Sequence, residues 1–250
     1  MGLSSNILWH QTDFKTLKKI IRSKHLVCSY SLETFLDREH KLAFPMISLS
    51  DIPVADINEY MGQYGGCLIG FSRGWVIENG FNPVWYCEKN NQALKEHKKQ
   101  LYRTFNIDAN NKSANKLTWL ALQYGAYIKD IEGPLHVKSK NVTYANYRFY
   151  DEREYRYVPD FMTLLNKEIQ PALFEEDYCK YKKEKGNGLI DHSVPFSFND
   201  IKMLIVKTDN QVTEIKKLLQ HENHTIHVFT HDEINQSIIG VHHQLVTEKK

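Results

Sequence analysis

The residues best suited to chemistry lie in one stretch, Tyr147 to Pro159, which reads Tyr-Arg-Phe-Tyr-Asp-Glu-Arg-Glu-Tyr-Arg-Tyr-Val-Pro. Its aromatic and charged residues interleave without a helical period, which predicts a turn that enters a short strand. Side chains alternate faces along a strand, so Glu152, Glu154 and Arg156 would share one face. Paired carboxylates beside a guanidinium are suited to general acid or base work and to stabilising a developing positive charge.

The opposite face of the same strand would carry Arg153, Tyr155 and Tyr157. The alternative to a site is an exposed edge strand, because charged side chains are a common means of preventing an edge from pairing with other chains. The functional interpretation therefore needs support from other parts of the chain.

Two earlier strands supply polar side chains that can join this site. His10 and Thr12 lie at the end of an expected first strand, and Ser48 and Ser50 alternate with apolar residues in a later strand bounded by prolines. Each has a structural alternative. A lone histidine at a strand end is often a hydrogen-bonding group of the fold, and Ser50 is equally suited to capping a helix.

The elements that must position these groups are short. Phe14, Leu17, Ile20 and Ile21 recur at helical spacing and predict an amphipathic helix to about Lys24. Further strands are expected within 26–31, 67–71, 83–86, 198–206 and 226–230, and further helices within 72–77, 117–122 and 212–219. Residues 32–40 are expected to form a polar helix or a loop, and residues 178–188 a loop or a solvated helix.

These elements predict a single α+β domain over residues 1–250, with a split, mostly antiparallel sheet flanked by helices. A polar helical insertion is expected at about 88–122, where Lys, Asn and Gln replace the strand pattern. The strand, helix and strand after residue 198 predict a βαβ-like unit packed on the edge of the core.

Composition narrows the class of protein. The 250 residues carry a formal net charge of +2, with Lys and Arg spread along the chain, so no strong general affinity for nucleic acid or anionic membrane is expected, although a local basic patch stays open. Four cysteines form no Cys-x-x-Cys pair, which favours reduced thiols. The N-terminal segment has no signal-peptide pattern and no run approaches a spanning helix, so we expect a cytoplasmic protein without a membrane partner. The histidines at 221, 224, 227 and 231 lack a zinc-ligand spacing, and no metal is expected.

The order of the polar groups along the chain resembles that of ADP-ribosyltransferases. In that family a histidine on the first strand holds an NAD ribose, a later strand supplies hydroxyl groups, and a glutamate on a late strand drives the chemistry. His10-x-Thr12, followed by a helix with a Leu-x-x-Ile-Ile pattern, is similar to the start of DarT-type DNA-modifying transferases. The chain departs from that family in one respect, since none of Arg22, Arg38 and Arg73 can be assigned to the role of its catalytic arginine, which leaves the acceptor open.

From Ile7 to Ile234 the chain more closely resembles the AbiGi family of bacterial abortive-infection, phage-resistance proteins. Family members are described as the antitoxin half of a two-gene system. The resemblance is carried by Pro45-Met46-Ile47-Ser48, Asp51-Ile52-Pro53, Tyr64-Gly65, Asn82-Pro83-Val84-Trp85-Tyr86, the stretch from Asp151 to Pro159, and Asp200-Ile201-Lys202.

The transferase resemblance implies NAD as a substrate and assigns roles to the residues above. Glu154 would stabilise the oxocarbenium-like centre formed when nicotinamide leaves, and Glu152 would take a proton from the incoming nucleophile. Arg156 would hold Glu154 through a bidentate contact, so Arg156→Lys is expected to lower turnover more than stability. The NAD site would comprise His10, Thr12, Ser48 and Ser50, with Tyr30 or Tyr64 stacked on the nicotinamide unless these rings belong to the core.

Two classes of function follow. The first is an enzyme of phage defence that transfers ADP-ribose from NAD to a nucleic-acid or protein acceptor, or hydrolyses NAD without an acceptor. The second is a non-enzymatic antitoxin or sensor that binds a cognate toxin, antitoxin or phage-encoded trigger. The first requires turnover at Glu154, whereas the second requires only a binding surface.

Overall fold

The computed structural model describes residues 6–34, 41–57, 66–88, 91–110, 116–137, 141–185, 188–220 and 226–237. The chain begins with β1 (Ile7–Thr12), α1 (Phe14–Ser23) and β2 (His25–Thr34). The side chain of Asp13 accepts the backbone N–H of Thr16 and caps α1. The helix ends at Ser23, the next residue Lys24 caps it in the left-handed conformation, and the helix buries Leu17, Ile20 and Ile21, as their spacing predicts.

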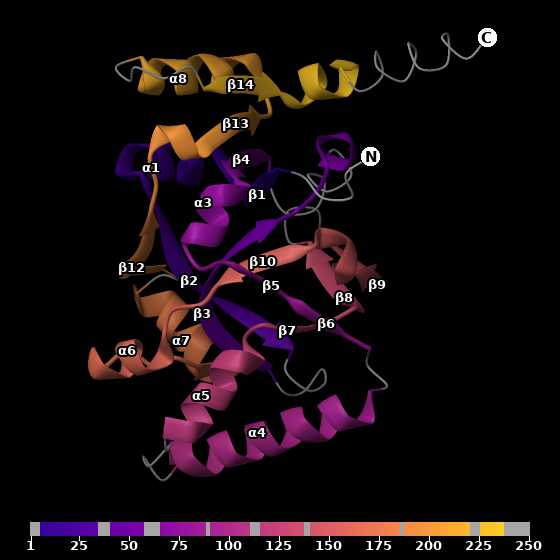
Figure 1. Cartoon of the computed structure of the whole chain (residues 1–250), viewed down its shortest axis with the longest axis vertical. Helices are drawn as coiled ribbons and strands as arrows, with labels where there is room; N and C mark the ends of the chain where they lie inside the picture. Colours follow the sequence, from indigo (N-terminus) through magenta and orange to yellow (C-terminus); the bar gives the residue numbers. More distant parts are fainter. Residues whose placement is uncertain are drawn as a thin grey trace, which may run out of the picture.

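The large sheet follows the path β12-β2-β3-β1-β4-β13-β14 (Figure 1). In this sheet the described strands pair antiparallel except β13 with β14. The fold is therefore mixed α+β with a mostly antiparallel sheet, and this part of the fold prediction is confirmed. The strands not yet delimited are β3 (Lys41–Ser50), β4 (Cys67–Ser72), β12 (Gly188–Pro195), β13 (Ile201–Val206) and β14 (His227–Thr230).

The C-terminal unit confirms the βαβ prediction. β13 and β14 run parallel, and α8 (Asp209–Leu219) connects them. Thr208 caps α8, which buries Ile215 and Leu219. The unit extends the sheet beyond β4 and occupies the upper end of the molecule in Figure 1.

The third strand is the centre of the sheet because it changes partners along its length. Its residues 41–46 pair with β2, and Ser50 pairs with Trp9 of β1. Residues 47–50 also pair with β10 (Glu154–Tyr157), while 42–43 pair with β11 (Leu173–Phe174). Between Met46 and Ser50, β3 therefore leaves its ladder with β2 and reaches that with β1.

The segment from residue 82 to residue 152 leaves the large sheet and returns to it. β5 (Asn82–Pro83) pairs with β10, and β6 (Trp85–Cys87) pairs parallel with β7 (Ile128–Asp130). Two helices lie between β6 and β7, α4 (Gln92–Asn110) and α5 (Lys116–Gly125), in the region where the sequence predicts helices. Both lie at the end of the molecule opposite α8 (Figure 1). The hairpin of β8 (Glu132–Val137) and β9 (Val142–Arg148) and the 3-10 turn η2 (Phe149–Glu152) lead back to β10.

Short elements cover the rest of the sheet, and one local prediction needs correction. They are η1 (Val54–Asp56), α3 (Arg73–Glu78), α6 (Phe161–Asn166), α7 (Glu175–Lys185) and η3 (Phe198–Asp200). Residues 32–34 extend β2 instead of forming a polar helix or loop, because their ladder with β3 continues to Thr34. Residues 35–40 lie outside the described part of the chain. For the lysine-rich interval, where the sequence predicts a loop or a solvated helix, the helix is confirmed: α7 is mostly exposed and packs on β2, β3 and β11 with its remaining side chains.

Core packing joins the sheet to its helices. Phe71 stacks on Trp75 of α3 and meets Phe196 edge-on, and Phe44 of β3 stacks on Phe161 of α6. In the described ranges no helix is long and apolar enough to cross a membrane.

Candidate functional site

Glu154 and Arg156 lie side by side on one face of β10, as their spacing predicts. Both are buried, with 5% and 0% of their surface exposed. β10 pairs with β3 on one side and with β5 on the other. The alternative of an exposed, charged edge strand is therefore wrong, because these charges point into the molecule.

Glu154 is held by charged and polar groups on both carboxylate oxygens. Its Oε1 accepts hydrogen bonds from Ser48 Oγ at 2.6 Å and Arg156 Nε at 2.7 Å. Its Oε2 accepts from Arg156 Nη2 at 3.0 Å and from Lys129 Nζ at 2.9 Å. Burial raises the pKa of Glu154, but the charges of Arg156 and Lys129 and the hydrogen bonds outweigh it and hold the pKa well below its usual range.

Glu152 reaches the same place by a different route from the one predicted. It ends the 3-10 turn η2, and Arg153 follows in the left-handed conformation with φ 44°, so the strand begins only at Glu154. Glu152 is thus not on the strand face. The turn nevertheless directs its carboxylate to Lys129, whose Nζ lies 3.0 Å from Glu152 Oε2.

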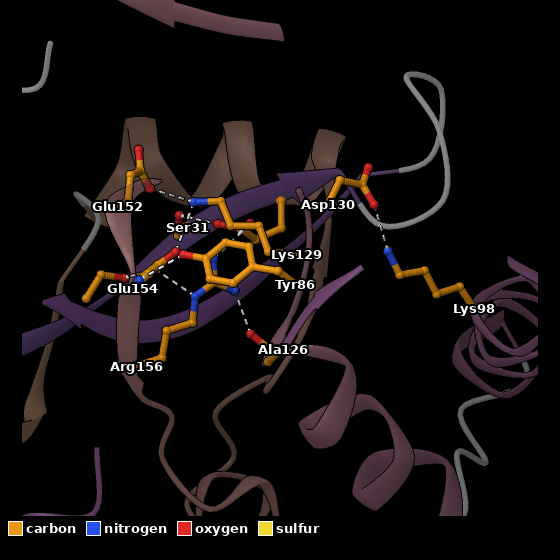
Figure 2. Close-up of polar contacts among 11 residues, drawn as sticks. Ser31, Tyr86, Lys98, Ala126, Lys129, Asp130, Glu152, Glu154 and Arg156 are labelled. Carbon is orange, nitrogen blue, oxygen red and sulfur yellow. Dashed lines mark hydrogen bonds and ion pairs between the residues drawn. The ribbon is translucent and has the colours of Figure 1, made fainter. Parts of the chain in front are cut away.

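Lys129 of β7 stands between the two carboxylates (Figure 2). Its Nζ also lies 4.6 Å from the centre of the Phe149 ring, a cation–π distance. Burial lowers the pKa of Lys129, but the neighbouring charges of Glu154, Glu152 and Glu33 outweigh it and raise the pKa above its ordinary value. Lys129 is therefore protonated at neutral pH.

Arg156 connects three elements at the base of the site. Its Nε and Nη2 grip Glu154 in the bidentate manner that the sequence predicts, and Nη1 donates to the carbonyl oxygen of Ala126 at 2.6 Å (Figure 2). Its Nη2 also lies 3.1 Å from Glu33 of β2. We call the five charged residues Glu33, Lys129, Glu152, Glu154 and Arg156 the ionic cluster.

A cavity of about 470 Å³ opens over the ionic cluster. It lies where β3 passes from β2 to β1, so its walls come from all three strands and from the β7–β8 region. The lining residues are His10, Gln11, Val27, Ser29, Ser31, Leu32, Glu33, Thr34, Met46, Ile47, Ser48, Ser50, Lys129, Asp130, Gly133, Pro134, Leu135, Phe149, Glu152 and Glu154.

The structure brings His10, Ser48 and Ser50 together in this cavity with the two glutamates. His10 Nδ1 lies 3.1 Å from the carbonyl oxygen of Ser48 and donates to it in the neutral tautomer that carries the proton on Nδ1. Burial lowers the pKa of His10 below its ordinary value, although the hydrogen bond to Ser48 opposes this shift. His10 is therefore neutral at pH 7.

Two other predicted NAD-site residues, Thr12 and Tyr30, are not among the described walls of the cavity. Thr12 is buried but does not line the cavity. Tyr30 is on the opposite face of β2 from Ser29 and Ser31, where its hydroxyl donates to Gln170 and its ring meets Tyr181 edge-on. The prediction that Tyr30 stacks on a ligand in this cavity is therefore wrong, because strand alternation places its ring in the core. Tyr64 lies outside the described residues.

Sequence reasoning missed Lys129, Glu33 and Tyr86. The hydroxyl of Tyr86 accepts the backbone N–H of Glu154 at 2.8 Å. Lys129 had one local signal, since it is a lysine in the otherwise largely apolar run Ala126-Tyr127-Ile128-Lys129-Asp130-Ile131. Tyr86 ends the phrase Asn82-Pro83-Val84-Trp85-Tyr86, which carries part of the AbiGi resemblance but does not indicate a site. Glu33 had no signal, because its neighbours in sequence do not resemble a site.

The described residues contain no cluster of three or more His, Cys, Asp or Glu that could hold a metal ion. His221 and His224 lie outside them. All four cysteines are free, and burial raises the pKa of the Cys28 thiol to about 12, so this thiol is unreactive at neutral pH.

The fold and site together define a mixed α+β protein with a buried ionic cluster beneath a cavity. Residues 15–207 match the family model described as "Putative abortive phage resistance protein AbiGi, antitoxin", and the chain belongs to this family. It is 26% identical over 183 residues to the abortive phage resistance protein AbiGi of Lactococcus lactis subsp. cremoris, covering 65% of this chain and 71% of that protein. No solved structure matches the chain. The AbiGi resemblance is confirmed, and the ADP-ribosyltransferase resemblance stays a prediction.

Proposed function

We propose that this chain is the antitoxin of an abortive-infection system that resists phage, and that it acts by binding a cognate toxin without turnover. The matching family is described as an antitoxin, and the Lactococcus relative is described as an abortive phage resistance protein. The family match covers the cavity-lining residues from Val27 to Glu154, while His10 and Gln11 of β1 lie before it.

The observation that carries the proposal is the state of Glu154. A carboxylate that stabilises a ribosyl cation must offer an oxygen to the ligand. Both oxygens of Glu154 already accept hydrogen bonds from the protein, Oε1 from Ser48 and Arg156 and Oε2 from Arg156 and Lys129. Burial raises the pKa of Glu154, but the charges of Arg156 and Lys129 outweigh it, so this carboxylate is also unsuited to act as a general base near neutral pH. These contacts favour a role in holding β7, β10 and β3 together.

Co-expression tests this proposal. The chain is expressed alone and with its cognate toxin in a bacterial host, and growth is recorded. We expect no loss of growth from the chain alone and restored growth when it accompanies the toxin. His10→Ala and Ser50→Ala, which alter the cavity wall, should still restore growth if neutralisation needs binding and no turnover. Toxicity of the chain alone that Glu154→Gln relieves would contradict the proposal.

The cavity supports a second candidate, ADP-ribosyl transfer from NAD. Its walls bring together His10, Ser48 and Ser50 with Glu152 and Glu154, the group order that resembles the transferases. An ionised Glu154 would stabilise the positive ribosyl centre as nicotinamide departs. Glu152 would then take the proton of an acceptor nucleophile that bonds to the ribosyl carbon.

Labelled NAD separates the two candidates. The purified protein is incubated with adenine-labelled NAD and cell extract, and proteins, nucleic acids and small molecules are resolved. The antitoxin proposal predicts unchanged NAD. Labelled nucleic acid or protein would support transfer, and free ADP-ribose would support hydrolysis. In either enzymatic case, His10→Ala should weaken NAD binding, and Glu214→Gln on α8 is the matched control that should not.

A further inference from the structure

The described walls of the cavity carry more negative than positive charge. Carboxylates come from Glu33 and Asp130 as well as from Glu152 and Glu154. Lys129 is the cation among the described lining residues, since burial lowers the pKa of His10 and leaves it neutral.

The cations that offset these carboxylates lie deeper than the carboxylates nearest solvent. The side chain of Arg156 is 0% exposed, that of Lys98 on Asp130 is 8%, and that of Lys129 is 15%. By contrast, Glu33 is 18% exposed and Asp130 is 24%. Glu33, Asp130, Glu152 and Glu154 carry four negative charges, whereas Lys129, Arg156 and Lys98 carry three positive charges, so the described walls and their ion-pair partners keep one negative charge in excess, which favours a cation over a phosphate.

The remaining walls suit a long basic side chain. Leu32, Pro134 and Leu135 provide apolar surface on which the methylene groups of Lys or Arg can lie. The Phe149 ring already has the ammonium group of Lys129 beside it, at 4.6 Å from its centre. The hydroxyl of Ser29, which also lines the cavity, is suited to accept an N–H group.

We propose that the cavity receives an Arg or Lys side chain presented by the toxin, with the cation placed between Glu33 and Asp130. This inference rests on the antitoxin function proposed above and names the chemistry of its contact. The carboxylate pair would favour association and select a basic partner, because complementary charges steer encounter and exclude like charges. The contact would join β2 and β7 through the incoming side chain.

The first test uses the unaltered protein and two small probes. N-acetyl-arginine amide and N-acetyl-citrulline amide are nearly isosteric, but only the first is charged. Isothermal titration calorimetry at low salt should give binding of the arginine amide about tenfold tighter than that of the citrulline amide. The difference should shrink in high salt. Equal binding, or no binding of either probe, would overturn the proposal. Binding of spermidine but not of the arginine amide would also overturn it, in favour of a small polyamine.

The second test uses the complex with the toxin. Glu33→Gln and Asp130→Asn should each weaken toxin binding about tenfold, while Glu214→Gln, which alters an ion-paired glutamate on α8, should leave it unchanged. Circular dichroism and the melting temperature of each variant show whether it is folded. If the unaltered chain fails to bind the toxin, the antitoxin function itself is wrong. If it binds and both folded cavity variants bind equally well, only the present inference is wrong.

Discussion

Two regions of this molecule each contain an ion pair, and the two pairs are of nearly equal length. The first region is the ionic cluster below the cavity, and the second is the surface between α1 and α8. Arg156 Nε lies 2.7 Å from Glu154, and Lys18 Nζ lies 2.9 Å from Glu214. The side chains of Arg156 and Glu154 are 0% and 6% exposed. Those of Lys18 and Glu214 are 27% and 52% exposed. Water therefore screens the pair on the helices but not the pair below the cavity.

The two regions also differ in what else holds them together. α1 and α8 each bury apolar side chains, Leu17 and Ile21 on one and Ile215 and Leu219 on the other, so the surface pair adds little to their packing. In the ionic cluster the charged residues are themselves the connection between β2, β7 and β10. Distance alone therefore does not measure the contribution of an ion pair to stability, which depends on burial and on the number of partners.

The largest effect is expected for Arg156→Met. This change leaves Glu33 and Glu154 without their guanidinium and the carbonyl group of Ala126 without its donor. Breaking a buried pair from one side costs about 3–5 kcal/mol, because the other charge stays buried. Urea unfolding monitored by circular dichroism should show this loss. A change below about 1 kcal/mol, as at an exposed pair, would remove the distinction between the two regions.

Acid is expected to remove part of the same stabilisation. Burial raises the pKa of Glu154, but Arg156 and Lys129 lower this pKa by more than burial raises it. The folded state therefore favours the ionised carboxylate more than the unfolded chain does. This contribution is complete above the unfolded carboxyl pKa of about 4.3 and is lost as the pH falls below it. The free energy of unfolding at pH 7, 5 and 3 measures the loss. Glu154→Gln should be less stable at pH 7 yet fall less steeply, and an unchanged slope would show that another group titrates.

Arg156→Lys separates the effect of charge from that of geometry, because it keeps the positive charge and removes the planar guanidinium group. A lysine cannot reproduce the contacts to Glu154, Glu33 and Ala126 together, so we expect a loss of about 2 kcal/mol in urea unfolding. The sequence-based expectation placed the effect on turnover more than on stability, but full burial makes stability respond as well. Full stability of Arg156→Lys would mean that charge alone is required.

The smallest effect is expected for Lys18→Met, which removes the surface ion pair between α1 and α8. Exposed pairs contribute about 0–1 kcal/mol, and Lys18 also lies 4.7 Å from the ring of Phe14, which the methionine side chain can still cover. The same urea measurement at low and high salt is informative, because salt should reduce even this small difference. A loss as large as that of Arg156→Met would contradict the role assigned to burial.

Local patterns in the sequence determined the elements and one face of the site. The spacing of Phe14, Leu17, Ile20 and Ile21 predicted α1, which the structure confirms over Phe14–Ser23. The strand, helix and strand of the C-terminal unit followed from the same kind of signal. The alternation of Glu154 and Arg156 placed both on one face of β10, because residues two apart on a strand point the same way.

The tertiary structure alone decided what surrounds that face. Lys129 and Glu33 meet Glu154 and Arg156 only because β7 and β2 converge on β10, and periodicity carries no information about such distant partners. The left-handed turn at Arg153 decided how Glu152 reaches Lys129, and strand alternation in β2 sent Tyr30 into the core. The physical reason is that local propensity fixes which way a side chain leaves its own element, whereas long-range packing fixes which charges it meets and how far water is excluded from them.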